Sequence, residues 1–349
     1  MKIIDTTSLV FIKAIKALLR YYYSETEYHS TLGGDDFCHH LSMDNPILVI
    51  PDSFSDLDTE EFLLTFLEIL NQDRDISIYT AYGRNIYNFP PKTAVSVGKS
   101  KALDEIVARL ANSNYYLVEG EFEKSFHSIS EHVEAILMPK TSYYRARIGS
   151  ILKASNFDWK KMRHEEEFHE AYRNSEIGAP PIHLAKGGRI NRPGVSYLYL
   201  STDAETAVSE VRPHPGENVS VGEFKSTQEL KIADFSQLSL TQKLFSDDGL
   251  DALELMIAIQ NTLSKAVSPS MNRQYSVTQF IAEIVRKIGF DGLAFKSSVS
   301  GGKNYVVFNP ETFEWVSGSG RVFRVTAVSY TTEAQQYFDT EEDYDLIYN

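Results

Sequence analysis

Arginine side chains occur at two places where the surrounding sequence is apolar or rich in glycine. Arg145 follows two tyrosines, and Arg189 lies in the glycine-rich stretch 187–194. A polar side chain in such surroundings is costly unless it has a partner. The planar guanidinium group of arginine matches phosphate oxygens in two-point contacts, which lysine gives less specifically. The two arginines are therefore suited to hold a ligand that contains phosphate.

A carboxylate and two hydroxyl groups occur further along the chain. Tyr199 lies in a segment of alternating pattern, Glu210 follows an expected helix start, and Ser297 ends an apolar run. A carboxylate stabilises positive charge that develops during a reaction, more strongly where water is excluded. A tyrosine ring can stack on a ligand while its hydroxyl group donates a hydrogen bond, as a serine hydroxyl also can. Together these groups could hold a ligand and stabilise positive charge that develops on it.

The order of these residues resembles that in the RES (Arg-Glu-Ser) domain family of bacterial NAD-degrading toxins. The motifs are Tyr144-Arg145, Gly188-Arg189-x-Asn191-x-x-Gly194, Leu198-Tyr199-Leu200-Ser201-Thr202, Thr206-Ala207, Glu210-Val211-Arg212, Gln279, Gly289-Phe290-Asp291-Gly292, Ser297 and Val306-Val307-Phe308. Each motif alone is weak, whereas their ordered succession is specific. Residues 1–138 lie outside the resemblance.

The resemblance implies an enzyme that takes NAD as its substrate and needs no cofactor. It implies cleavage of the nicotinamide glycosidic bond by phosphorolysis or hydrolysis, with inorganic phosphate or water as acceptor, and arrest of growth. It also implies control by a separate helix-turn-helix antitoxin protein. Residue by residue, it assigns catalytic roles to Arg145, Tyr199 and Glu210, and NAD binding to Arg189 and Asn191.

The serine of the family's name has two candidates in this sequence. Ser297 is preferred as the catalytic serine, because it closes the strand expected after Gly292. Ser276 is the second candidate, as an NAD-binding residue ahead of Gln279. Ser276-x-x-Gln279 also fits a capping box, in which two side chains satisfy free amides of the first helical turn. That structural role is favoured for Ser276, and Ser297 could equally be a plain residue at a strand end.

Each candidate has an ordinary structural interpretation as well. Arg189 alone fits a surface turn, Glu210 a solvated helix, and Tyr199 a core position in a strand. The segment 164–169 holds two histidines, but they are not at the spacing that places metal ligands on one helical face, so a solvated helix and no metal site are expected. Two other functions stay open: transfer of ADP-ribose to a macromolecule, and a catalytically inactive binding module.

An α+β fold is expected to position these residues. Apolar residues recur at helical spacing in 8–23, 60–70, 102–110 and 128–137, which predicts a mainly helical domain over residues 1–138. That domain could inhibit, target or oligomerise the enzyme. Strand signals become frequent after residue 139, which predicts a catalytic domain over residues 139–349. The resemblance implies that this domain is a compact mixed sheet similar to that of ADP-ribosyltransferases.

Within the second domain, the pattern predicts strands and helices in alternation. Strands are expected over 196–201, 218–225, 230–235, 288–295 and 304–309, and helices over 250–267 and 277–288. Another helix is expected to start at Thr202-Asp203-Ala204-Glu205, which fits a capping box. The alternation in 196–201 places Tyr199 and two other hydroxyl-bearing side chains on one face of a strand.

The composition argues against several classes of protein. The net charge of −14 argues against nucleic acid as a direct partner, since such binding depends on lysines and arginines that neutralise phosphates. The single cysteine, Cys38, cannot form an internal disulfide, as expected in a reducing cytoplasm. The apolar segment 8–19 contains two lysines and is shorter than the ~20 residues that span a bilayer. A cytoplasmic protein with no membrane association is expected.

Overall fold

The computed structural model describes residues 8–23, 61–62, 64–66, 68, 100–158, 160–237, 247–265, 275–329 and 332. Its helices are α1 (Leu9–Tyr22), α6 (Lys101–Asn112), α7 (Tyr115–Val133), α8 (Ala204–Glu210), α9 (Asp247–Ser264) and α10 (Tyr275–Lys287). Its strands are β1 (Glu134–Leu137), β2 (Ser142–Ile148), β3 (Ile151–Asp158), β4 (Arg163–Glu170), β5 (Leu198–Ser201), β6 (Asn218–Ser226), β7 (Leu230–Asp234), β8 (Gly292–Lys296), β9 (Lys303–Val307), β10 (Phe313–Trp315) and β11 (Arg321–Arg324). Short 3₁₀ helices cover Asn174–Glu176, Ile182–Leu184 and Pro310–Thr312. The predicted α+β class is confirmed.

One mixed sheet carries the fold. Its strands follow the order β1-β7-β8-β9-β5-β2-β6-β10, and β11 also pairs with β6. Strands β7 and β8 are parallel, and the other neighbouring pairs are antiparallel. Strand β5 lies between β9 and β2 in the middle of this order. The central strands therefore bring together segments that are far apart in the sequence.

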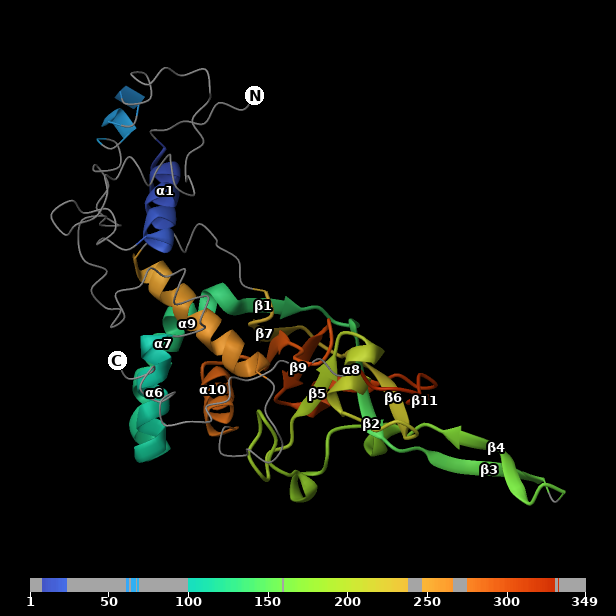
Figure 1. Cartoon of the computed structure of the whole chain (residues 1–349). Helices are drawn as coiled ribbons and strands as arrows, with labels where there is room; N and C mark the ends of the chain where they lie inside the picture. The colour runs from blue at the N-terminus through green and yellow to red at the C-terminus, as the bar shows by residue number, and fades with distance from the viewer. Residues whose placement is uncertain are drawn as a thin grey trace, which may run out of the picture.

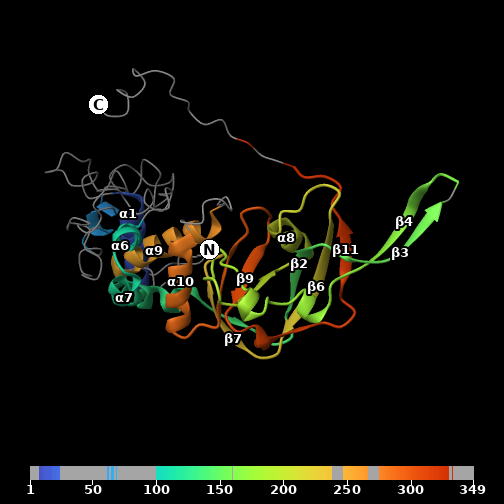
Figure 2. The same cartoon turned by 90° about the horizontal axis from the view of Figure 1, so that it is seen from below.

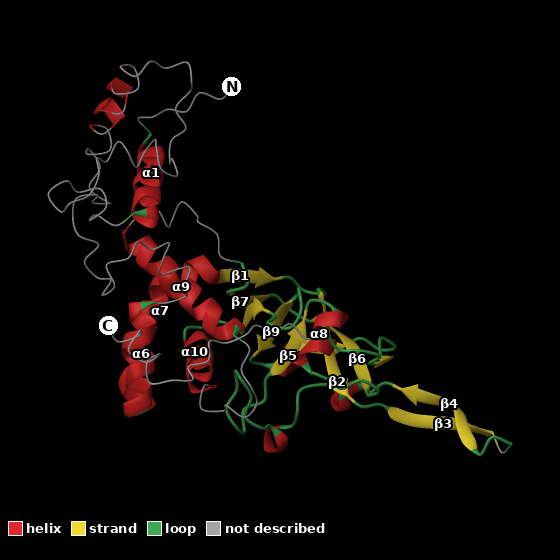
Figure 3. Ribbon diagram, in the orientation of Figure 1, coloured by secondary structure: helices red, strands yellow, loops and turns green. Residues whose placement is uncertain are grey.

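Helices α6, α7, α9 and α10 pack together at the end of the sheet that holds β7, β8 and β9 (Figures 1 and 3). Alternation along the strands decides which side chains meet them. Leu293 and Phe295 of β8 pack in the cluster that includes these helices, whereas Ala294 packs in the cluster on the other side. In β5, Tyr199 contacts the helix cluster while Leu198 lies in the other one, as the sequence pattern predicts.

The helices that precede residue 138 share the core of the sheet. Val118 and Phe122 of α7 are fully buried, and the ring of Phe122 stacks on Phe280 of α10 with centroids 5.3 Å apart. A helix of this kind is stabilised mainly by burying its apolar face, and the sheet with its helices supplies that surface. In the described residues, a continuous core spans the border that the sequence placed between residues 138 and 139.

The helix expected over residues 128–137 is only partly present. Helix α7 ends at Val133, and the next four residues form β1, which pairs antiparallel with residues 230–233 of β7. Val133 is still buried as helical spacing requires. The residues beyond it gain backbone hydrogen bonds to the sheet, and this tertiary pairing outweighs the local helical pattern.

Strands β3 and β4 form a separate two-stranded sheet that projects from the main sheet as an arm (Figures 1 and 2). The solvated helix predicted over residues 164–169 is therefore wrong, because these residues lie in β4 and pair antiparallel with β3. An acidic run is typical of a solvent-exposed helix, but a two-stranded ribbon that projects from the fold exposes both of its faces as well. The composition therefore does not distinguish the two. The ladder of hydrogen bonds to β3 then decides the conformation.

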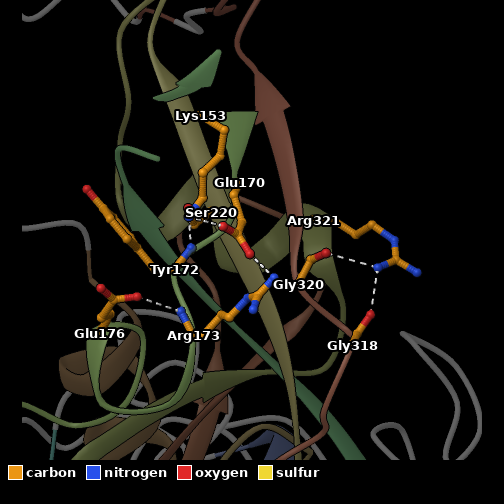
Figure 4. A network of polar contacts seen from close by, with 9 residues as sticks. All are labelled: Lys153, Glu170, Tyr172, Arg173, Glu176, Ser220, Gly318, Gly320 and Arg321. Carbon is orange, nitrogen blue, oxygen red and sulfur yellow. Dashed lines mark hydrogen bonds and ion pairs between the residues drawn. The ribbon is translucent and has the colours of Figure 1, made fainter. Parts of the chain in front are cut away.

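The base of the arm is tied to the main sheet by polar contacts (Figure 4). Within the arm, Glu170 at the end of β4 pairs with Lys153 of β3, with 2.6 Å between Oε2 and Nζ. Ser220 of β6 accepts a hydrogen bond from the backbone N–H of Tyr172 at 3.1 Å and donates one to the carbonyl of Gly149 at 2.7 Å. Residues on both sides of the arm are therefore fixed by the same serine of the sheet.

Some expectations fall outside the described part of the chain. Cys38 lies there, and the helix expected over 60–70 is described only at 61–62, 64–66 and 68, where the chain is helical. None of the described helices is both long and apolar enough to cross a membrane.

Candidate functional site

The candidate site lies where α8 ends beside the loop that joins β8 to β9. Helix α8 starts at Ala204, directly after β5, as the sequence predicts. Its N-cap is Asp203 rather than Thr202, because the carboxylate of Asp203 accepts from the backbone N–H of Thr206 at 2.7 Å. Thr202 instead donates to Asp203 at 2.9 Å. The short helix that this cap starts ends at Glu210.

The carboxylate of Glu210 receives two hydrogen bonds on one oxygen. The hydroxyl of Ser297 and the side-chain amide of Asn304 each donate to Oε1 at 2.6 Å. Within the described residues, the other oxygen, Oε2, has no hydrogen-bond partner, and Glu210 is exposed. Two donors thus fix the carboxylate and leave one oxygen directed at whatever occupies the site.

The structure distinguishes between the two candidate serines. Ser297 contacts Glu210, and its oxygen accepts from the backbone N–H groups of Val299 and Ser300 at 3.2 and 3.1 Å. These two amides orient the hydroxyl so that its hydrogen points to the carboxylate. The structure therefore brings the preferred serine, which follows the end of β8, to the glutamate of α8.

Ser276 lies elsewhere, as an exposed residue inside α10. The capping box proposed for Ser276 and Gln279 is not formed, because the helix already includes Tyr275 and the Gln279 amide points away. That amide donates to the carbonyls of Gly188 at 2.7 Å and Asn191 at 3.1 Å. Gln279 thus holds the glycine-rich turn against α10.

The glycine-rich turn is organised from within by Asn191 and Tyr199. Asn191 is buried, and its amide donates to the carbonyls of Lys186, Arg192 and Val195. Its carbonyl oxygen accepts from the hydroxyl of Tyr199 at 2.7 Å, and burial raises the pKa of that phenol well above its usual range. In this structure, both residues that were expected to touch NAD use their polar atoms to shape the turn.

Arg189, in the same turn, uses only part of the hydrogen-bonding capacity of its guanidinium group. Its Nη2 donates to the carbonyl of Thr262 at 3.1 Å, and the group lies 5.7 Å from the ring centre of Phe295. Its Nε is buried and has no partner among the described residues. Burial lowers the pKa of Arg189, while the carboxylate of Glu210 acts in the opposite direction. An arginine with an unused donor therefore lies within electrostatic reach of the glutamate.

Arg145 has a different environment from the one expected of a substrate anchor. From β2, its Nε donates to the carbonyl of Ile177 at 2.7 Å and its Nη1 to the carbonyl of Tyr199 at 2.9 Å. Burial lowers the pKa of Arg145 to about 10, so the group remains cationic at neutral pH. Two of its three nitrogens are thus used to join β2, β5 and the segment that follows the arm.

Replacing Arg145 with lysine is expected to lower stability more than substrate binding. Lysine retains the charge but cannot reach two carbonyls with one planar group, so about 1–3 kcal/mol of unfolding free energy should be lost. Urea unfolding measures this loss, and the KM for NAD should stay close to that of the parent protein. A large rise in KM at unchanged stability would instead return Arg145 to the role of substrate anchor.

Gly188 is packed so closely that a methyl group there should distort the turn. A Cβ atom would lie 2.6 Å from Oδ1 of Asn191 and 3.2 Å from the hydroxyl oxygen of Tyr199. Asn191 cannot move aside without losing buried hydrogen bonds, so Gly188→Ala should cost about 1–3 kcal/mol of unfolding free energy. The control is Gly301→Ala, since nothing lies within 4 Å of its added Cβ. Equal thermal midpoints for the two variants would contradict this prediction.

Two cavities of about 390 and 310 Å³ lie elsewhere, near the base of the arm. They share Asn174 and Trp315 among their lining residues. Neither is lined by Arg189, Glu210 or Ser297. The exposed Glu210 site is therefore separate from them, and a bound molecule would itself shield the carboxylate from water.

Comparison with known proteins finds a family model that matches the part of the chain that holds this site. Residues 162–326 match the family model described as the RES domain, which confirms the resemblance seen in the motifs. The matched segment contains Arg189, Tyr199, Glu210 and Ser297, whereas Arg145 precedes it.

Among solved structures, one similar to this chain is the crystal structure of the M. tuberculosis MbcT–MbcA toxin–antitoxin complex. The identity is 13% and the TM-score 0.34, and the match covers 58% of this chain and 92% of that one. No curated protein matches the sequence.

Proposed function

We propose that the RES domain of this chain degrades NAD by cleaving the bond between nicotinamide and ribose. The observation that carries the proposal is the Glu210 carboxylate, which Ser297 and Asn304 hold through one oxygen within electrostatic reach of the partly unused guanidinium of Arg189. Arg189, Glu210 and Ser297 are one of the two arginines, the glutamate and the preferred serine to which the resemblance assigns roles, and the RES family match covers these three.

In this reaction, the bond between the anomeric carbon and the nicotinamide nitrogen breaks with both electrons going to nicotinamide. Nicotinamide then leaves as a neutral molecule, and positive charge remains on the ribose carbon. The carboxylate of Glu210, through Oε2, stabilises that charge and holds the ribose hydroxyl groups. Water or phosphate attacks the same carbon, and the proton of the attacking group is lost to solvent. The products are nicotinamide and ADP-ribose or its phosphate ester.

Arg189 is proposed to bind the pyrophosphate of NAD. Its Nε is buried and has no partner among the described residues, so an anion that reaches it would satisfy a donor that is otherwise costly to bury. A guanidinium also binds phosphate oxygens in pairs. Tyr199 and Asn191 support this binding by holding the turn that presents Arg189.

Ser297 is proposed to take part in the reaction through its hydroxyl group. Its hydrogen lies on Glu210, and two backbone amides fix its oxygen. A ligand that replaces Glu210 as the acceptor, such as the carboxamide of nicotinamide, would receive the same hydrogen bond. Ser297 would then position the leaving group while Glu210 meets the ribose.

The family also suggests a biological setting for the activity. We propose that the protein is a cytoplasmic toxin that arrests growth by consuming NAD, and that a separate helix-turn-helix antitoxin covers the site. An exposed carboxylate needs such a cover, because NAD in the cell could otherwise reach it freely. The helices before β1 pack on the catalytic sheet, which supports a role in stabilising it.

The proposal is tested by incubating the full-length protein with NAD, with and without phosphate, and identifying the products by mass spectrometry. Release of nicotinamide with ADP-ribose indicates hydrolysis, and a phosphate-dependent product of higher mass indicates phosphorolysis. If NAD labelled in its adenine leaves label attached to a macromolecule, the activity is ADP-ribosyl transfer rather than the proposed reaction. NAD that remains intact in both buffers would leave only the inactive binding module.

A further inference from the structure

One of the two residues that donate to Glu210, Asn304, is one that the sequence did not single out. We infer that Asn304 is a positioning residue, which orients the Glu210 carboxylate and is itself oriented by Ser201. The inference rests on the proposed function, because the orientation of the Glu210 carboxylate affects activity through the proposed reaction. It adds Asn304 and Ser201 to the arginine, glutamate and serine of the proposed site, as residues that orient Glu210.

Register places the two residues of this line opposite each other in the middle of the sheet. Ser201 of β5 is paired directly with Asn304 of β9, so their side chains leave the sheet on the same face. The hydroxyl of Ser201 donates to Oδ1 of Asn304 at 2.9 Å. Both side chains are almost fully buried, with 3% and 6% exposure.

This contact decides which way the Asn304 amide faces. A carboxamide has an acceptor end and a donor end, and a buried amide adopts the orientation that satisfies both. Ser201 occupies the acceptor end, so the donor end is directed at Oε1 of Glu210, 2.6 Å away. The hydrogen bonds therefore run in one direction, from the buried serine through the amide to the carboxylate.

Asn304 and Ser297 both donate to Oε1 of Glu210, but one lies in a strand and the other in a loop. Ser297 lies after the end of β8, in a loop with an exposed neighbour on either side, whereas Asn304 belongs to a central strand. A donor on a strand holds its partner more precisely than one on a loop. Asn304 is thus suited to keep Glu210 in place when the Ser297 hydroxyl turns to the substrate.

The test compares Asn304→Asp, Asn304→Ala and Ser201→Ala with the parent protein, with NAD as substrate. Aspartate has nearly the shape of asparagine, but its carboxylate would replace the donor with an acceptor that repels Glu210. We expect kcat to fall roughly 10- to 100-fold in Asn304→Asp and less in the alanine variants, with a smaller change in KM. Asn309→Ala, an exposed asparagine two residues beyond β9, is the matched control and should keep the parent kcat.

A second measurement does not depend on activity. In the protein with ¹⁵N-labelled asparagine, the side-chain amide signals of Asn304 should shift in both Glu210→Gln and Ser201→Ala. If the parent does not consume NAD but these signals shift, the proposed reaction fails while the hydrogen-bonded line stands. The inference would be overturned if the parent is active and Asn304→Asp keeps the parent kcat. It would also be overturned if the Asn304 signals do not shift in either Glu210→Gln or Ser201→Ala. A kcat that falls only in proportion to the folded fraction, measured by circular dichroism, would do the same.

Discussion

Glu210→Gln is expected to lower the kcat for NAD consumption by roughly 10²- to 10³-fold, the range seen when a preorganised electrostatic partner of a transition state is removed. Glutamine keeps the shape and can still accept hydrogen bonds from Ser297 and Asn304. It lacks the negative charge that stabilises the cationic ribose carbon. The loss should therefore appear mainly in kcat, because the positive charge on the ribose carbon develops only in the transition state. Nicotinamide release measured at several NAD concentrations separates kcat from KM.

The matched control for this variant is Glu205→Gln, because Glu205 is an exposed glutamate on the same helix. It should retain the parent kcat. Equal activity of the two glutamine variants would remove Glu210 from the mechanism. The thermal midpoints of both variants should stay near that of the parent, because Glu210 is itself exposed.

Arg189→Ala is expected to lower kcat/KM for NAD by roughly 10- to 100-fold, mostly through a higher KM, because one charge-assisted phosphate contact is lost. Arg189→Lys should recover only part of this loss, since an ammonium group restores the charge without the two-point contact. Steady-state kinetics at several NAD concentrations separate the two parameters. The expected weak effect of salt on the parent KM follows from the burial of this group.

Arg192→Ala is the control for Arg189, because it removes a second arginine from the same turn. Its KM should remain within about twofold of the parent value, as is usual for an exposed or partly exposed charge. A comparable rise in KM in both variants would mean that the turn attracts NAD by its general positive charge rather than through Arg189.

Motifs in the sequence singled out candidate site residues because these are polar residues in apolar or glycine-rich settings. That logic brought out Arg189, Glu210 and Ser297, and the structure places Ser297 on Glu210. The same logic singled out Tyr199 and Asn191, which bond to each other in the structure. A polar residue that needs a partner can find it in the protein as well as in a ligand, and sequence spacing alone does not distinguish the two.

Asn304 and Gln279 show what the sequence could not supply. Their partners lie 94 and 91 residues away in Glu210 and Gly188, and both contacts follow from strand order and helix packing. Asn304 carried one signal, a polar residue in an otherwise apolar strand opposite Ser201. Using it would have required the β5–β9 register, which arises only from the assembled sheet.

The errors in secondary structure have the same origin. Residues 134–137 and 164–169 look helical by composition and spacing, yet both form strands. Each segment pairs with another part of the chain, and the pairing supplies hydrogen bonds that the local pattern does not reveal. The strands and helices of the central sheet were predictable because their burial matches their periodicity.

The two donors on Glu210 lie 87 and 94 residues after it, in the loop that follows β8 and in β9. The ribosome therefore synthesises the glutamate and both arginines well before the residues that orient the carboxylate. While synthesis continues, the growing chain lacks both donors that fix this carboxylate. The site is therefore complete only after β9 has left the ribosome tunnel and paired with β5.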